Sequence, residues 1–303
     1  MNHRRRTMSE ATLVAERQVE SRILNSSRTV RIALPPSYTP GEASRFPVLY
    51  LQDGQNVFST AGPHSCFGWG SWQVDRSAAR LAAAGRAREV ILVAVDNTPQ
   101  RYVEYRGPSS STASPDGAGG SARDPHVRYR RFLIEELKPI IDREFRTCPG
   151  PAHTGILGSS MGGLCSLAIA WEHPEVFGLA GCLSGAFQVD RMHFLRNTLA
   201  RHRGPSKPVR IYLDSGVVDY TGGDDGCSNT RRVTAELRRI GWREGVDLCH
   251  WVDEHPLGPS QLGETGLPEG KWHEAERSQH NEFYWRLRFP RALEFLLPPA
   301  GGG

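Results

Sequence analysis

Gly155-Ile156-Leu157-Gly158-Ser159-Ser160-Met161-Gly162-Gly163 is the most informative segment of this 303-residue chain. An apolar run precedes its glycines, and apolar side chains follow them at helical spacing, which predicts a strand, a sharp turn and a helix. The spacing Gly158-x-Ser160-x-Gly162 matches the nucleophile-elbow pattern, in which glycines flank a serine because a Cβ would collide with the strand or helix. A glycine-rich turn gives the same short pattern by chance, but the strand and helix around it favour the elbow.

An elbow of this kind predicts a reactive hydroxyl at Ser160. The turn lifts that hydroxyl above the sheet and directs the Met161 amide, at the positive end of the following helix, toward the place where an oxyanion would form. A serine hydroxyl is a poor nucleophile at neutral pH, so it needs an imidazole as base and an acid that orients the imidazole. In sheets of this type the chain order is serine, acid, histidine.

Composition excludes several other classes of protein. The chain has 37 Lys and Arg against 33 Asp and Glu, a net charge of +4, so nucleic acid or an anionic membrane is not expected as its main partner. Six cysteines form no C-x-x-C pair, which argues against a zinc site, and we expect no metal and no cofactor. The basic first residues precede no continuous apolar run, so we expect no export signal, no membrane span and a cytoplasmic location.

Strands alternate with helices along most of the chain. Residues 12–23 and 28–34 predict two antiparallel strands, and 47–52, 89–96, 155–157, 179–183, 209–214 and 246–252 predict buried strands. Helices are expected at 71–84, 127–146 with an interruption near Pro139, 190–200 and 230–240. This order predicts an α/β fold whose mostly parallel sheet carries antiparallel N-terminal strands and helices on both faces. We expect one domain over 12–298, with flexible ends at 1–11 and 299–303.

The acid should follow the strand at 209–214. Asp219 lies just past the carboxyl end of that strand, the edge where sites of open α/β sheets assemble, and is our first choice. Asp214 is expected to satisfy turn amides instead. Asp224 and Asp225 lie further into a glycine-rich loop and have the pattern of solvated turn residues.

Eleven histidines compete for the role of base. Beyond the last strand only His255, His273 and His280 remain, since His250 lies inside that strand. His280 directly precedes the C-terminal helical segment, which would fix its position, so it is the first choice and His273 the second. The second oxyanion amide is expected from the loop after the strand at 47–52, at Gln55, although a simple Asp-Gly turn there fits equally.

Several segments together resemble a known family. They are 31–38 (RIALPPSY), 48–58 (VLYLQDGQNVF), 101–105 (RYVEY), 136–142 (ELKPIID), 158–162 (GSSMG) and 280–286 (HNEFYWR). In this order they resemble the esterases of the esterase D type in the α/β-hydrolase superfamily. The resemblance implies a triad of Ser160, Asp219 and His280, with the backbone amides of Gln55 and Met161 as oxyanion donors.

The branch that shares HNE and DGQNVF is similar to hydrolases that include trilactone siderophore esterases. Feruloyl and acetyl esterases, mycolyltransferases and S-formylglutathione hydrolases are more distant relatives. The expected function is therefore a serine esterase acting on a small-molecule ester. Acyl transfer to an alcohol or sugar, and a non-catalytic binding protein of the same fold, are the alternatives.

Further residues could shape the substrate site. Arg101 and Glu104 are candidates for substrate binding, although a structural ion pair explains both. The segments 107–125 and 254–279 are expected to border the pocket, the former as a mobile loop. The sequence leaves the natural ester and the oligomeric state open.

Overall fold

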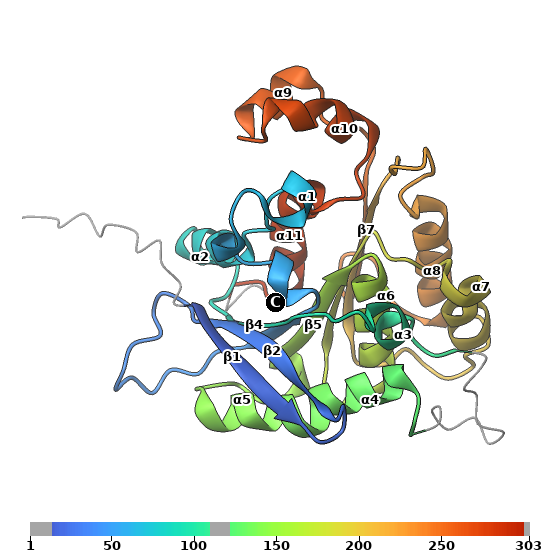
Figure 1. Cartoon of the computed structure of the whole chain (residues 1–303). Helices are drawn as coiled ribbons and strands as arrows, with labels where there is room; N and C mark the ends of the chain where they lie inside the picture. Colours follow the sequence, from blue (N-terminus) through green and yellow to red (C-terminus); the bar gives the residue numbers. More distant parts are fainter. Residues whose placement is uncertain (1–13, 110–121, 300–303) are drawn as a thin grey trace, which may run out of the picture.

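A computed structural model of the chain describes residues 14–109 and 122–299 (Figure 1). An eight-stranded sheet runs through it in the order β1-β2-β4-β3-β5-β6-β7-β8. The strands are β1 Val14–Ser21, β2 Ser26–Ala33, β3 Val48–Leu51, β4 Ile91–Val95, β5 Thr154–Ser159, β6 Leu179–Leu183, β7 Arg210–Gly216 and β8 Leu248–Asp253. The expectations for 1–11, for most of the loop 107–125 and for the last four residues lie outside the described residues.

The sheet has the predicted mixture of strand directions. β1 pairs with β2 and β2 with β4 in antiparallel fashion, whereas the pairs from β4 through β8 are parallel. The register places Ser159 opposite Leu183, Leu183 opposite Asp214, and Asp214 opposite Trp251. The carboxyl ends of β5, β6, β7 and β8 therefore meet at one edge, and the segments that follow them are brought close together.

Alternating residues of the central strands build two cores. Val48 and Tyr50 of β3 join one buried cluster, whereas Leu49 and Leu51 of the same strand join another. The first cluster is covered by α6 Met161–Glu172, α8 Cys227–Ile240 and the helical residues 125–144. The second is covered by α2 Val74–Ala83 and α11 Glu282–Leu296. Helices on both faces and a mostly parallel sheet confirm the predicted α/β-hydrolase type of fold.

The helix expected at 127–146 is interrupted, as predicted. It consists of α4 Pro125–Arg131, a π-helical segment Phe132–Leu137 and α5 Lys138–Glu144. Pro139 lies at the start of α5, where its missing N–H and its ring disturb the regular hydrogen-bond pattern. The region 190–200 is less regular than the predicted helix: α7 Val189–His193 contains Asp190, Arg191 and Met192 at positive φ and leads into a π-helical segment Phe194–Leu199.

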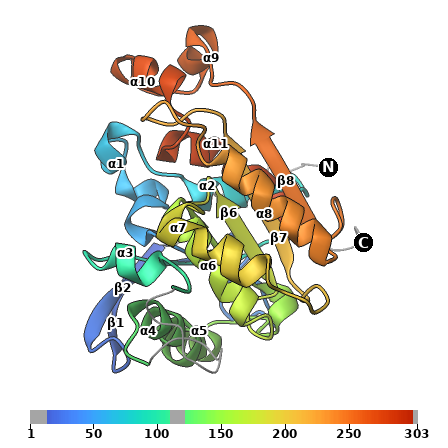
Figure 2. The same cartoon turned by 90° about the vertical axis from the view of Figure 1, so that its right-hand side faces the viewer.

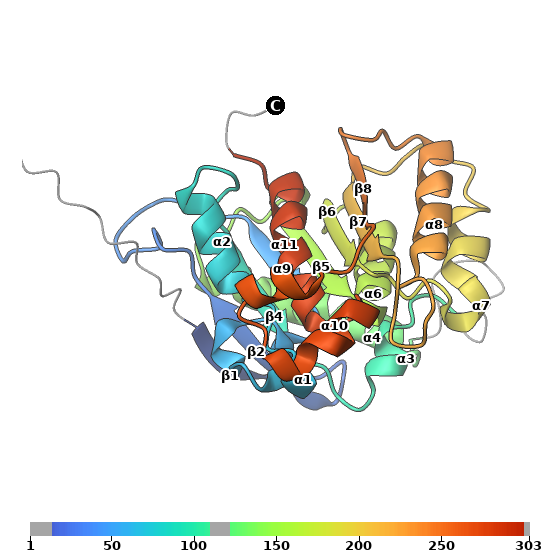
Figure 3. The same cartoon turned by 90° about the horizontal axis from the view of Figure 1, so that it is seen from above.

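Residues 254–279 form a small cap above the carboxyl edge of the sheet, which we call the cap segment. It contains α9 Pro259–Glu264 and α10 Trp272–Arg277, and it stands over α1 Ser65–Gly68 and the start of α11 in all three views (Figures 1, 2 and 3). Leu262, Leu267 and Ala275 pack with Phe283 and Tyr284 of α11 into a separate apolar cluster. The cap segment is thus packed onto the helix that follows His280.

Within residues 14–109 and 122–299, no helix is long and apolar enough to cross a membrane. In the same described ranges, no group of three or more His, Cys, Asp or Glu side chains is arranged to hold a metal ion.

Candidate active site

Ser160 occupies the turn between β5 and α6 in a strained backbone conformation. Its φ is 52° and its ψ is −123°, values that a residue with a Cβ rarely adopts. The Ser160 N–H donates to the Leu183 carbonyl at 2.8 Å, and the Ser160 carbonyl accepts from the Ala186 N–H at 3.0 Å. The chain on both sides of β6 therefore holds the turn in place, and the predicted elbow geometry is present.

The glycines of the elbow allow an approach that no other residue would permit. A Cβ on Gly158 would lie 2.6 Å from the backbone carbon and oxygen of Gly162, and one on Gly163 would lie 2.8 Å from Cys182 Sγ. The first of these contacts is with backbone that cannot move without displacing α6. Gly158 is thus required by the close packing of the first turn of α6 on β5.

Gly158→Ala is expected to destabilise the fold by about 3 kcal/mol, because the new methyl group would overpack a rigid contact. Urea unfolding followed by circular dichroism measures the loss. Gly150→Ala is the matched control, since a Cβ there meets nothing within 4 Å and the φ of −72° suits alanine. Equal stability of the two variants would contradict the packing argument.

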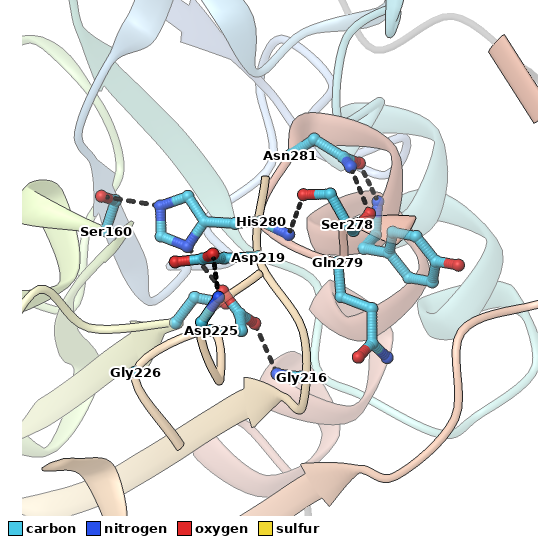
Figure 4. A network of polar contacts seen from close by, with 12 residues as sticks. Ser160, Gly216, Asp219, Asp225, Gly226, Ser278, Gln279, His280 and Asn281 are labelled. Atoms are coloured by element: carbon cyan, nitrogen blue, oxygen red, sulfur yellow. Dashed lines mark hydrogen bonds and ion pairs between the residues drawn. The ribbon is translucent and has the colours of Figure 1, made fainter. Parts of the chain in front are cut away.

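His280 lies between Ser160 and a carboxylate (Figure 4). Its Nε2 is 3.0 Å from Ser160 Oγ, and its Nδ1 is 2.5 Å from Asp225 Oδ1. An ionised carboxylate only accepts, so the proton belongs on Nδ1, which leaves Nε2 free to accept from the serine hydroxyl. Asn281 helps to hold the ring in place, because its side chain caps α11 by accepting from the Tyr284 N–H at 3.2 Å.

The prediction that Asp219 is the acid is wrong in this geometry. Asp219 Oδ1 accepts from Thr221 and Gly223 of its own loop, from the two N–H groups at 2.8 Å each and from the Thr221 hydroxyl at 2.6 Å. Partial burial opposes ionisation of Asp219, but these hydrogen bonds outweigh it and lower its pKa. Asp219 is thus a turn-forming residue, and the carboxylate on His280 is Asp225, which the sequence had suggested to be a solvated turn residue.

Asp225 is held at the end of the loop that follows β7. It is 1% exposed and adopts a positive φ of 51°. Its Oδ2 accepts from the Gly216 N–H and from Ser184 Oγ, the latter at 2.7 Å, while Ser184 Oγ accepts from Trp285 Nε1 at 3.1 Å. These donors satisfy the oxygen that does not face His280, so the carboxylate is oriented as well as buried.

Arg288 of α11 connects the acid to the sheet. Its guanidinium lies 3.0 Å from Asp214 Oδ1 and 3.5 Å from Asp225 Oδ2, and it donates to the Gln279 carbonyl at 2.7 Å. Asp214 is fully buried, and that burial raises its pKa to about 6. Asp214 does accept from a turn amide, that of Ser184, as expected, but its closer partner is Arg288.

Gln279 anchors the chain immediately before His280. Its Oε1 accepts from the Val217 N–H at 2.7 Å, its Nε2 donates to the Asp253 carbonyl at 2.9 Å, and its N–H donates to the Val218 carbonyl at 2.8 Å. The side chain is fully buried. His280 is therefore fixed to the carboxyl ends of β7 and β8 rather than carried by a free loop. The rejected alternatives His255 and His273 are exposed in the cap segment.

The two expected oxyanion donors lie at the starts of two helical segments: Met161 directly follows Ser160 at the start of α6, and Gln55 lies in the turn after β3. Gln55 belongs to the short 3₁₀ turn Gly54–Asn56 after β3, and it lines the same cavity as Ser160. The Gln55 side chain accepts from the Asn97 N–H at 3.1 Å, which orders the turn. Gln55 and Met161 lie in the first turn of their helical segments, where backbone N–H groups have no acceptor within the helix. Both amides are thus free to bind an oxyanion.

Arg101 and Glu104 both form ion pairs, but with different partners. Arg101, in α3 Arg101–Tyr105, binds both oxygens of Asp53 at 2.7 and 2.8 Å and lines the cavity beside Ser160. Glu104 is 5% exposed and pairs with the buried Arg28 at 2.7 Å. Glu104 is absent from the lining of that cavity, so of the two only Arg101 can contact a substrate there.

Two cavities flank the catalytic pair, one lined by Ser160 and the other by His280. One has a volume of about 520 Å³ and holds Ser160, Gln55, Asp53, Arg101 and Glu282 among its lining residues. The other, of about 780 Å³, is lined by His280, by the loop that carries Asp219 and Tyr220, and by α10 of the cap segment. Phe67, which is 93% exposed, lines both. The expected border formed by residues 254–279 is therefore present at the second cavity.

Comparison with known proteins identifies the family. The family model described as "Putative esterase" matches residues 21–241. Ferri-bacillibactin esterase BesA of Bacillus subtilis is 24% identical over 243 residues, which cover 76% of this chain and 80% of BesA. The uncharacterized protein YbbA of the same organism is 24% identical over 163 residues, 53% of this chain, and the match spans only 58% of YbbA.

One solved structure with a similar fold is that of an esterase. The enterobactin esterase FES from Shigella flexneri aligns with a TM-score of 0.65 and 17% sequence identity, over 96% of this chain and 60% of that chain. At this identity the structural likeness concerns the fold. The family model covers most of the chain, and the chain therefore belongs to this esterase family.

Proposed function

We propose that this protein hydrolyses carboxylic esters through an acyl-enzyme formed on Ser160. The observation that carries the proposal is the continuous contact from Ser160 Oγ through His280 to Asp225. In the first step Ser160 Oγ attacks the ester carbonyl carbon while its proton passes to His280 Nε2. The carbonyl oxygen becomes an oxyanion that the N–H groups of Gln55 and Met161 bind.

The intermediate then collapses and releases the alcohol. The bond between the carbonyl carbon and the alcohol oxygen breaks, and that oxygen takes the proton from His280 Nε2. Water then attacks the carbonyl carbon of the acyl-enzyme while His280 takes its proton. The bond to Ser160 Oγ breaks, Ser160 Oγ regains the proton from His280, and the free acid leaves. Asp225 keeps the Nδ1 proton in place and stabilises the imidazolium formed in each half-reaction.

The substrate class is a small-molecule ester, with a siderophore trilactone as the first candidate. Similarity to ferri-bacillibactin esterase over most of both chains supports this choice. The cavity lined by Ser160 and the cavity lined by His280 offer space for the two portions of an ester.

A mixed panel tests the proposal. It contains a catecholate trilactone, a feruloyl ester, an acetylated sugar and a short aryl ester, with products identified by mass. A fluorophosphonate is added to a parallel sample, and peptide mass spectrometry locates the label. Hydrolysis together with labelling at Ser160 is expected, and selective opening of the trilactone would assign the siderophore class.

A protein that binds esters without turnover, and whose Ser160 takes no label, would overturn the proposal. Transfer of the acyl group to an added alcohol in preference to water would replace hydrolysis by acyl transfer.

A further inference from the structure

The chemistry of the two half-reactions divides the ester between the two cavities. His280 must protonate the departing alcohol oxygen, so the alcohol portion lies on the side of the 780 Å³ cavity that His280 lines. The carbonyl oxygen must face the Gln55 amide, which lines the 520 Å³ cavity together with Ser160. The acyl portion therefore occupies the smaller cavity, which we call the acyl cavity.

One carboxyl group of the acyl cavity already has its charge balanced. Asp53 binds the guanidinium of Arg101 through both oxygens, and its Oδ1 also accepts from Asn97 Nδ2 at 2.5 Å. Such a bidentate pair leaves little net charge for a substrate to meet. Arg101 is correspondingly committed to Asp53 and does not act as a free cation.

The second carboxyl group, that of Glu282, has no such cation. Its hydrogen-bond partners are uncharged: the Cys66 thiol, and a neutral amide, Asn56 Nδ2, at 3.3 Å from Oε1. This contact joins the HNE segment to the DGQN segment across the cavity, and neither the proton relay nor the oxyanion amides use it. Glu282 therefore retains hydrogen-bonding capacity toward the space in which the acyl group lies.

The charge of Glu282 changes near neutral pH. Burial raises its pKa to about 7; its own backbone N–H, His280 and Arg101 act in the opposite direction, and Asp53 adds to the rise. The Cys66 thiol also faces it, and its own pKa is raised to about 12, mainly by burial, so it stays neutral. Below pH 7 the acyl cavity is close to neutral, and above pH 7 it carries one uncompensated negative charge.

We propose that Glu282 determines which acyl groups the enzyme accepts: it hydrogen-bonds a hydroxyl group on a neutral acyl portion and excludes acyl portions that carry a carboxylate. The inference rests on the proposed ester hydrolysis and assigns the acyl side of the same site. If the contact between Glu282 and Asn56 only stabilised the turn that carries Gln55, it would affect the hydrolysis of every ester equally. A selective group instead changes the ratio between substrates.

Three aryl esters of benzoic acids test the assignment. They share the 4-nitrophenyl leaving group and carry hydrogen, hydroxyl or carboxylate at the same position of the acyl ring, with the 3- and 4-positions tried in turn. The quantity measured is the ratio of kcat/KM between esters at pH 6 and pH 8. Ratios at one pH cancel every pH effect that the three esters share, because each ester is cleaved by the same nucleophile and base.

The wild-type enzyme is expected to favour the hydroxyl ester over the carboxylate ester by about tenfold more at pH 8 than at pH 6, since the repulsion appears as Glu282 ionises. Glu282→Gln keeps an acceptor for Asn56 but cannot ionise, so its ratio should be the same at both pH values. Glu294→Gln is the matched control on the same helix, outside both cavities, and should behave as the wild type.

The outcomes that would contradict the proposed function differ from those that would contradict only the role of Glu282. If the wild type turns over none of the panel esters and none of these three, the proposed function falls and the inference with it. If it turns over a panel ester but cleaves none of the three benzoate esters, ester hydrolysis stands and the role of Glu282 toward such acyl groups is overturned. If all three are cleaved in a Ser160-dependent reaction with ratios that do not change with pH, ester hydrolysis stands and the role of Glu282 is overturned. A pH-dependent ratio that survives in Glu282→Gln also overturns it.

Discussion

Ser160→Ala is expected to lower kcat by about 10⁶-fold, because removal of the nucleophile leaves only the oxyanion amides and binding to assist attack by water. The fold should remain intact, since alanine fits wherever serine does. Turnover of the ester that the panel selects measures the loss, and circular dichroism and urea unfolding report on the fold.

Ser166→Ala is the matched control for that variant. Ser166 lies in the same helix-forming segment, is fully buried, and its hydroxyl has no hydrogen-bond partner among the described residues. Its replacement should leave turnover unchanged. Near-normal activity of Ser160→Ala would reject the acyl-enzyme scheme, whatever the geometry of the relay.

Asp225→Asn is expected to lower kcat by about 10⁴-fold while Asp219→Asn changes it little. The amide nitrogen of an asparagine at 225 would face His280 Nδ1 as a donor and drive the imidazole into the tautomer that cannot accept from Ser160. Asp219 makes its hydrogen bonds within its own loop, so its replacement affects the loop alone.

The pair of variants is decisive because the two aspartates lie in one loop. A similar fall in kcat in both would mean that loop order, rather than the contact with His280, limits the reaction. A fall in Asp219→Asn alone would restore the assignment made from the sequence. Urea unfolding of Asp225→Asn is needed beside the kinetics, because Asp225 is buried and bonded to Ser184 and Gly216.

The parts of the site that sequence reasoning located share one property: each is tied to regular structure. Ser160 lies between a strand and a helix whose apolar periodicity is visible in the sequence, and His280 lies two residues before the C-terminal helix α11. Gln55 follows a short apolar strand by four residues. In such places a local pattern determines where the backbone goes, and the side chain follows.

Asp225 could not be located in the same way. Thr221-Gly222-Gly223-Asp224-Asp225-Gly226 is a glycine-rich turn in which any carboxylate can bond its own backbone. The loop folds back through contacts of long range in the sequence: Ser184 and Arg288 are distant from Asp225 along the chain and bind its carboxylate. The usable signal was its position directly before Gly226, where α8 begins, because a helix start limits how far a loop can move.

The cap segment contains more regular structure than the sequence predicted. Its sequence was expected to form a long loop at the border of the pocket, and the structure adds two short helices with an apolar cluster of their own. Leu262, Leu267 and Ala275 are too far apart for a helical period, so only packing against Phe283 and Tyr284 explains their burial.

The hydrogen bonds of Gln279 make the position of His280 independent of the length of the cap segment. A single hydrogen bond of 2.9 Å joins Gln279 Nε2 to the Asp253 carbonyl, so the chain leaves the sheet and returns to it at almost the same point. Everything from 254 to 278 is an excursion whose length does not determine where His280 lies. The fold can thus accommodate a different segment between 254 and 278. Such a segment would change the residues that contact the alcohol portion of the ester and would leave the position of His280 unchanged.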